Sequence, residues 1–124
     1  MSYNSADDVL RCVQDVVEFL GIDLTSVNQR GIFGNSPLAI VAGWGDVEAV
    51  KLLVAAGADV SLKVEGGDTA LHRAIAFGRG DVVKLLIENG ASATDHNDDG
   101  WSPRELALSQ GDARIVQLVH NAAG

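Results

Sequence analysis

The stretch Gly67-Asp68-Thr69-Ala70-Leu71-His72-Arg73-Ala74 decides the fold of this chain, because its pattern occurs again 33 residues earlier and 33 residues later. Four sets of identical residues coincide when the chain is shifted by this period: Gly34, Gly67 and Gly100; Gly45, Gly78 and Gly111; Val50, Val83 and Val116; Leu52, Leu85 and Leu118. A fixed period of this length is the signature of a repeat architecture, in which one unit cannot bury its apolar face alone. We therefore expect a stack of three units.

Each unit predicts a short helix, a turn and a second helix. A hydroxyl residue followed by Pro or Ala begins the first helix, at Ser36, Thr69 and Ser102. Its side chain accepts a hydrogen bond from an otherwise unpaired amide, and proline is tolerated in the first turn. The glycines at 45, 78 and 111 end this helix, since glycine readily adopts the left-handed conformation. The second helices, with an apolar stripe that packs, are expected over residues 46–55, 80–88 and 112–120.

The units resemble ankyrin repeats, whose pattern reads roughly Gly-x-Thr-Pro-Leu-His-x-Ala, then Gly, an apolar helix and Gly-Ala-Asp. The second copy carries this pattern from Gly67 and Thr69 through His72 to Gly90 and Ala91. The resemblance covers about residues 21–124. It implies an all-α solenoid of helix-turn-helix-loop units of 33 residues. We expect a single domain over 1–124, divided into an N-terminal capping helix and long loop, two repeats and a C-terminal capping repeat, over residues 1–33, 34–66, 67–99 and 100–124.

Residues 5–20 predict one amphipathic helix ahead of the repeats. Ser5 can cap this helix, and its apolar residues recur at helical spacing: Val9, Cys12, Val13, Val16, Val17 and Leu20. The following Gly21-Ile22-Asp23 mimics the Gly-Ala-Asp ending of a repeat. The helix is therefore expected to cap the stack, since repeat arrays need ends with one polar face.

The column where the second helix begins holds Asp46 and Asp112 in the first and third units, but Arg79 in the middle unit. Aspartate caps a helix and complements its dipole, whereas Gly80, which follows Arg79, is a poor helix former. The substitution Arg79→Asp is therefore expected to stabilise the protein by roughly 0.5–1 kcal/mol.

The charge and the composition narrow the classes of partner. The chain has 124 residues and a formal net charge of −8, which argues against binding nucleic acid, whose phosphates require a basic face. Acidic residues fit a protein partner with a basic surface, although they also keep proteins soluble. An apolar run long enough to span a membrane and a signal peptide are both missing from the sequence, and the one cysteine, Cys12, cannot form an internal disulfide. We expect a cytoplasmic monomer.

Catalytic, cofactor-binding and metal-binding residues are not expected. The pattern Asp95-x-Asn97-x-Asp99-Gly100 matches the first half of a calcium loop, but its twelfth position is Leu106 instead of the required glutamate. His72 stands in the histidine column of the resembled family, which implies a hydrogen bond to the neighbouring turn. As a base it lacks a nucleophile within the motif, and His96 and His120 lack ligand spacing to one another.

In ankyrin repeat proteins the loop tips and the exposed face of the first helix form a concave contact surface. The resemblance therefore implies that a partner contacts Phe33, Asn35, Trp44, Glu65, Asp68, Phe77, Asp98, Trp101 and Gln110. Trp44 and Phe77 stand one period apart and should be neighbours, either exposed or partly buried between repeats. Trp101 could instead cover its own turn. The loop over 26–33, three residues longer than its counterparts, is either a contact loop or a terminal irregularity.

Two classes of function are open. The preferred one is an interaction module that binds a folded protein and performs no catalysis, and one version of it is an inhibitor or immunity protein that neutralises an enzyme or toxin. The alternative is an enzyme or metal-dependent protein built on a repeat scaffold.

Overall fold

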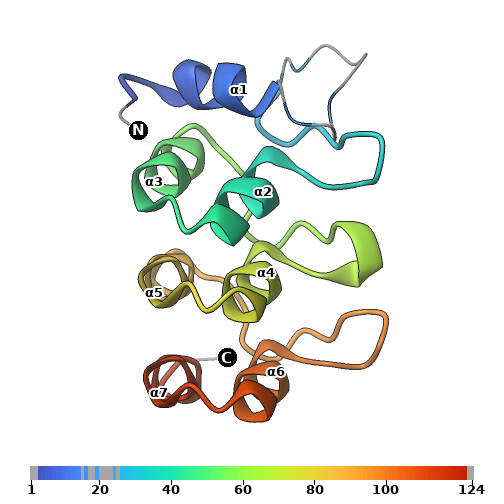
Figure 1. The fold of residues 1–124 in the computed structure, drawn as a ribbon, viewed down its shortest axis with the longest axis vertical. Helices are drawn as coiled ribbons and strands as arrows, with labels where there is room; N and C mark the ends of the chain where they lie inside the picture. Colours follow the sequence, from blue (N-terminus) through green and yellow to red (C-terminus); the bar gives the residue numbers. More distant parts are fainter. Residues whose placement is uncertain (1–2, 15, 17–18, 20–23, 25, 123–124) are drawn as a thin grey trace.

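The computed structural model describes residues 3–14, 16, 19, 24 and 26–122 of the chain. The helices within these residues are α1 (Ala6–Gln14), α2 (Pro37–Trp44), α3 (Val47–Ala55), the 3-10 helix η2 (Glu65–Gly67), α4 (Ala70–Ala76), α5 (Gly80–Glu88), α6 (Pro103–Gln110) and α7 (Ala113–His120). Figure 1 shows α2, α4 and α6 stacked in one layer and α3, α5 and α7 stacked in a second layer, with the long loops projecting from one side. The expected all-helical solenoid is confirmed. Within the described parts of the chain, every helix is too short or too polar to cross a membrane.

The hydroxyl residues begin the first helices as expected. The side-chain oxygens of Ser36, Thr69 and Ser102 accept hydrogen bonds from the backbone N–H three residues later, at 3.3, 3.4 and 3.2 Å. In α6, the carboxylate of Glu105 accepts the N–H of Ser102 in return, at 3.3 Å, which completes a capping box. In α4, the imidazole of His72 plays the equivalent part for Thr69. Each first helix therefore begins at a position set by the repeat.

The second helices differ in how they begin. The carboxylate of Asp46 accepts the N–H of Ala49 at 3.1 Å, and that of Asp112 accepts the N–H of Ile115 at 3.2 Å. Arg79 makes no such cap. Its Nε donates instead to the carbonyl of Gly43 in the preceding repeat, at 3.0 Å. The middle repeat therefore has a bond between repeats where the others have a helix cap.

This bond changes the expected effect of Arg79→Asp on the stability of the protein. The substitution adds a cap, worth about 1 kcal/mol, but it removes a hydrogen bond of similar worth, so the net gain inferred from the sequence is offset. Arg79→Ala is the matched control, because it removes the same bond and adds no cap. We expect the Asp variant to be about 1 kcal/mol more stable than the Ala variant in urea unfolding at equal slope. Equal midpoints would show that Asp81 already serves the start of α5.

The core lies between the two helical layers and between successive repeats. Equivalent apolar residues of the first two repeats are almost fully buried in pairs: Leu38 and Leu71, Ala42 and Ile75, Val50 and Val83, Leu53 and Leu86. The third repeat breaks this pattern, because Leu108, in the column of Ala42 and Ile75, is 67% exposed. Among the described residues, no further helix is stacked on this side of α6 (Figure 1).

Helix α1 is shorter than expected. It ends at Gln14 and Val16 lies in a bend, so the prediction of one continuous helix to Leu20 is wrong. The Val16 N–H donates to the Val13 carbonyl and the Phe19 N–H donates to the Val16 carbonyl, both at 3.0 Å, and Phe19 is fully buried. Clustered β-branched valines also weaken a helix. Val17, Leu20 and Gly21-Ile22-Asp23 lie outside the described residues.

The buried face of α1 packs on α3 and α2 through Val9 and Val13. Tyr3, which precedes the helix, is buried as well, and its hydroxyl donates to the Asp46 carboxylate at 2.7 Å. Burial, followed by the bond to this carboxylate, raises the pKa of the Tyr3 phenol. The start of the chain is therefore attached to the residue that caps α3.

Candidate protein-interaction surface

The three long loops close in the same way. The backbone N–H of Gly31, Val64 and Asn97 donates to the carbonyl four residues later, at 2.8, 2.7 and 2.9 Å. The same residues accept, through their carbonyls, the N–H of the repeat glycines Gly34, Gly67 and Gly100 at 2.9 to 3.0 Å. These glycines have φ between +73° and +85°, which is why the position requires glycine. Residues 32–33, 65–66 and 98–99 are consequently the central pairs of three equivalent turns; we call these six residues the loop row.

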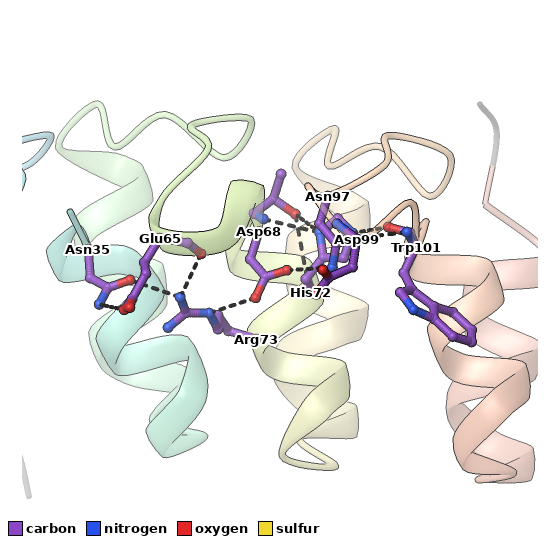
Figure 2. A network of polar contacts seen from close by, with 9 residues as sticks. Asn35, Glu65, Asp68, His72, Arg73, Asn97, Asp99 and Trp101 are labelled. Carbon is purple, nitrogen blue, oxygen red and sulfur yellow. Dashed lines mark hydrogen bonds and ion pairs between the residues drawn. The ribbon is translucent and has the colours of Figure 1, made fainter. Parts of the chain in front are cut away.

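A polar network at the base of the loops joins the three repeats (Figure 2). Arg73, on α4, is the hub of its first half. Its Nε donates to the Asp68 carboxylate at 3.0 Å, and its Nη2 donates to the Asn35 side-chain oxygen at 2.9 Å and to the Glu65 carbonyl at 3.0 Å. The guanidinium therefore ties the start of the first repeat to the loop of the second.

Asn97 and His72 carry the network into the third repeat. The Asn97 amide donates to Asp68 at 2.9 Å, and its oxygen accepts the N–H of Trp101 at 2.9 Å. His72 is fully buried; its Nδ1 accepts the Thr69 N–H at 3.1 Å, so the proton is on Nε2, which donates to the Trp101 carbonyl at 2.8 Å. The hydrogen bond expected between His72 and the neighbouring turn is present, and both ring nitrogens are occupied by it and by the helix cap.

Several residues expected to contact a partner belong to this network. Asn35 is only 8% exposed, and its amide is bonded to Arg73 and to Glu65. Asp68 is half-buried and paired with Arg73. Glu65 is exposed, although one of its carboxylate oxygens accepts a bond from Asn35 at 3.3 Å. Asn35 and Asp68 therefore hold the loops in place, and a partner would meet their neighbours first.

Trp44 and Phe77 are exposed at the C-terminal ends of α2 and α4. Trp44 is 41% exposed and Phe77 is 61% exposed, so both residues keep accessible surface although each is also partly covered. The Phe77 ring lies against Gly43, where its Cδ2 is 3.4 Å from the position that a Cβ would occupy. Gln110, one period further on, reaches back in the same way, since its amide donates to the Ala76 carbonyl at 3.4 Å. The small residues Gly43 and Ala76 thus make room for the side chain of the next repeat.

Trp101 and Asp98 occupy the third loop. The backbone of Trp101 is held by Asn97 and His72, while its side chain is 42% exposed. Figure 2 shows this ring directed away from the network and along α6. Asp98 is exposed, and its N–H donates to the Gly66 carbonyl at 2.9 Å. The third loop therefore rests on the second through its backbone, with the Asp98 carboxyl group close to Gly67 and the Trp101 residue exposed.

A column of cations, which we did not predict, links the loops. Arg30 donates through Nη2 to the Lys63 carbonyl at 2.6 Å, and Lys63 donates through Nζ to the His96 carbonyl at 3.0 Å. The three residues stand 33 apart, so the period could have revealed them. His96 in turn lies 3.1 Å from the Glu105 carboxylate. Hydrogen bonds from Ser102 and, to a lesser extent, this imidazole lower the pKa of Glu105.

Among the described residues, the acids at the loop tips form no ion pair. The ion pairs found among the described residues join Arg11 to Asp8, Arg73 to Asp68, His96 to Glu105 and Arg114 to Asp81. None of them involves Glu65, Asp98 or Asp99. In the same described part of the chain, no three or more His, Cys, Asp or Glu residues are grouped closely enough to hold a metal ion. In the calcium-like pattern, the Asn97 side chain is bonded within its own turn and to Asp68.

Comparison with known proteins shows one shared architecture in proteins of different roles. A family model of ankyrin repeats in three copies matches residues 5–97 and 68–123. Protein phosphatase 1 regulatory subunit 27 of Homo sapiens is 45% identical over 62 residues, which are 50% of this chain and 40% of that protein. Potassium channel AKT1 of Oryza sativa subsp. indica is 37% identical over 76 residues, 61% of this chain and 8% of the channel. Target of rapamycin complex 2 subunit AVO2 of Saccharomyces cerevisiae is 32% identical over 84 residues, 65% of this chain and 20% of that subunit. The chain spans less than half the length of each of these relatives.

Proposed function

Because this chain belongs to the ankyrin repeat family, we propose that it is a protein-interaction module that binds a folded partner through the exposed ends of α2, α4 and α6 and the adjoining loops, and that it performs no catalysis. We propose that this face is the concave side of the stack. The observation that carries the proposal is the pair Trp44 and Phe77, exposed at equivalent positions of successive repeats. Exposed aromatic side chains grouped in this way are typical of protein interfaces.

The electrostatic character of the chain favours a partner with a basic surface. The net charge is −8, and Glu65, Asp98 and Asp99 are exposed on the loops. Complementary charges of this kind mainly raise the association rate and the specificity of binding. We propose that the chain acts as a monomer in the cytoplasm, with the aromatic pair supplying most of the binding energy.

A second candidate, within the same class, is a protein that binds an enzyme and regulates or neutralises it. It is favoured by the similarity to a chain named as a regulatory subunit of a phosphatase. Under this version the partner is itself an enzyme, and adding this chain changes the activity of that enzyme. If the partner has no enzymatic activity, the regulatory role is excluded and the role as an interaction module remains.

Affinity capture with matched baits tests the proposal. The baits are the wild-type chain, the variant Trp44→Ala/Phe77→Ala and the control Leu108→Ala, which removes an exposed apolar side chain on the end face of α6. We expect quantitative mass spectrometry to show at least one protein that the wild type and the control retain and the double variant loses. Equal retention by all three baits would contradict binding through this face.

A further inference from the structure

The loop row changes character from the first of the three turns to the third. The first pair, Ile32 and Phe33, is apolar, with exposed fractions of 51% and 53%. The second pair is Glu65 with Gly66, and the third pair is Asp98 with Asp99, all four exposed. Because the three turns are closed by the same hydrogen bonds, these pairs occupy equivalent places along one side of the stack (Figure 1). The row therefore begins with an apolar tip and ends with a doubly acidic tip.

Two cations, Arg30 and Lys63, lie close to the loop row. Arg30 and Lys63 line a hollow of about 170 Å³ together with Glu65, so the middle tip is partly compensated although it has no ion pair. Both cations are themselves bonded to the carbonyl of the next loop. At the third tip the neighbouring His96 lies against Glu105 instead of the tip acids. The third tip, whose loop the Lys63 ammonium reaches at the His96 carbonyl, still carries two carboxylates where the second tip carries one.

The spacing of the tips sets the length of a partner segment that could contact both ends. Helices of neighbouring repeats, α2 with α4 and α4 with α6, are packed against each other, and packed helices lie about 8–10 Å apart. The first and third tips are therefore roughly 16–20 Å apart along the stack. An extended chain advances about 3.3 Å per residue, so five or six residues bridge this distance.

We propose that the loop row recognises an extended segment of a partner protein that carries an apolar residue at one end and lysine or arginine five or six residues away. This rests on the proposed function, because it assigns a second contact of the same partner, on the loops that precede α2, α4 and α6. The apolar residue lies on Ile32 and Phe33, removing their exposed surface from water, and the cationic residue lies between Asp98 and Asp99. Charge complementarity fixes which end of the segment meets which repeat.

A random library of linear 12-residue peptides displayed on phage is the probe. The baits are the wild-type chain, Asp98→Asn/Asp99→Asn and Ile32→Ser/Phe33→Ser, each compared with the wild type by circular dichroism and urea unfolding. We expect wild-type peptides to be enriched in Lys or Arg five or six residues from an apolar residue. A peptide selected in this way should bind the Asn variant at least about tenfold more weakly at low salt, and only the wild type should lose affinity steeply as NaCl is raised. The Ser variant should select peptides that keep the basic residues and lose the apolar one.

Several results would overturn the inference. The inference fails if the selected peptides lack this spacing or bind all three baits equally. It also fails if no linear peptide is enriched. If peptides depend on Trp44 and Phe77 but not on the loop row, the proposed function stands and this inference fails. Self-association in analytical ultracentrifugation that Ile32→Ser/Phe33→Ser abolishes would assign the apolar tip to a second copy of the chain, against the proposal.

Discussion

Gly67→Ala is expected to destabilise the protein by about 3 kcal/mol or more, combining strain from a left-handed backbone with steric overlap. Gly67 has φ +73°, where a Cβ is strained. A Cβ at this position would also lie only 2.8 Å from the Asp98 backbone nitrogen and from its carboxyl carbon. Relief would require the third loop to move away, breaking the bond from Asp98 N–H to the Gly66 carbonyl. Urea unfolding monitored by circular dichroism measures the loss.

Gly100→Ala is the matched control for this substitution. Gly100 stands in the same column, with φ +84°, but a Cβ there would meet no atom within 4 Å. Its cost should be that of the backbone alone, about 1 kcal/mol. Similar losses for the two variants would show that the third loop rests only loosely on the second, contrary to the structure.

Trp44→Ala/Phe77→Ala is expected to weaken binding of the captured partner at least about thirtyfold, because truncating a true aromatic anchor costs about 2 kcal/mol or more. Neither residue belongs to the buried core, and the Phe77 ring lies on Gly43. The helical spectrum and the melting temperature should therefore change little. Isothermal titration calorimetry with the purified partner gives the ratio of dissociation constants.

Leu108→Ala is the control for non-specific hydrophobic binding. Leu108 is more exposed than either aromatic residue, but it lies on another face of the protein. We expect this control to bind like the wild type. Unfolding of the double variant would mean that the aromatic pair supports the fold. If the double variant is folded and binds with unchanged affinity, the partner uses another surface. The loop over residues 26–33 would then be the next segment to substitute.

Local features of this fold were predictable where a residue interacts only with neighbouring residues of its own repeat. Ser36, Asp46 and Asp112 cap helices that begin next to them, and such caps depend on a few consecutive residues. The bond of Arg79 was not predictable in this way, because its partner, the Gly43 carbonyl, belongs to another repeat. The end of α1 was missed because the burial of Phe19 and the tight turns before it depend on tertiary packing.

The candidate surface was predictable in outline only. Trp44 and Phe77 were placed by their column, and the structure exposes both. Asn35 stands in a loop column with Asp68 and Trp101, yet it is buried because the Arg73 side chain reaches it from the next repeat. A hydrogen bond between residues 38 positions apart cannot be recognised from the neighbouring sequence. The repeat alignment alone therefore does not distinguish a residue that contacts a partner from one that holds the loops in place.

The links between Arg30, Lys63 and the following loops have a consequence for how such a chain can grow during evolution. Each link joins a side chain to a main-chain carbonyl of the next loop, and every residue has a carbonyl. A duplicated unit inserted into the array would find its acceptor already in place, with no compensating substitution required. The bonds of Arg73 to Asn35 and Asp68 are different, because they require particular side chains on the neighbouring loops. One set of contacts thus permits units to be added or lost, while the other preserves the order of the units that are present.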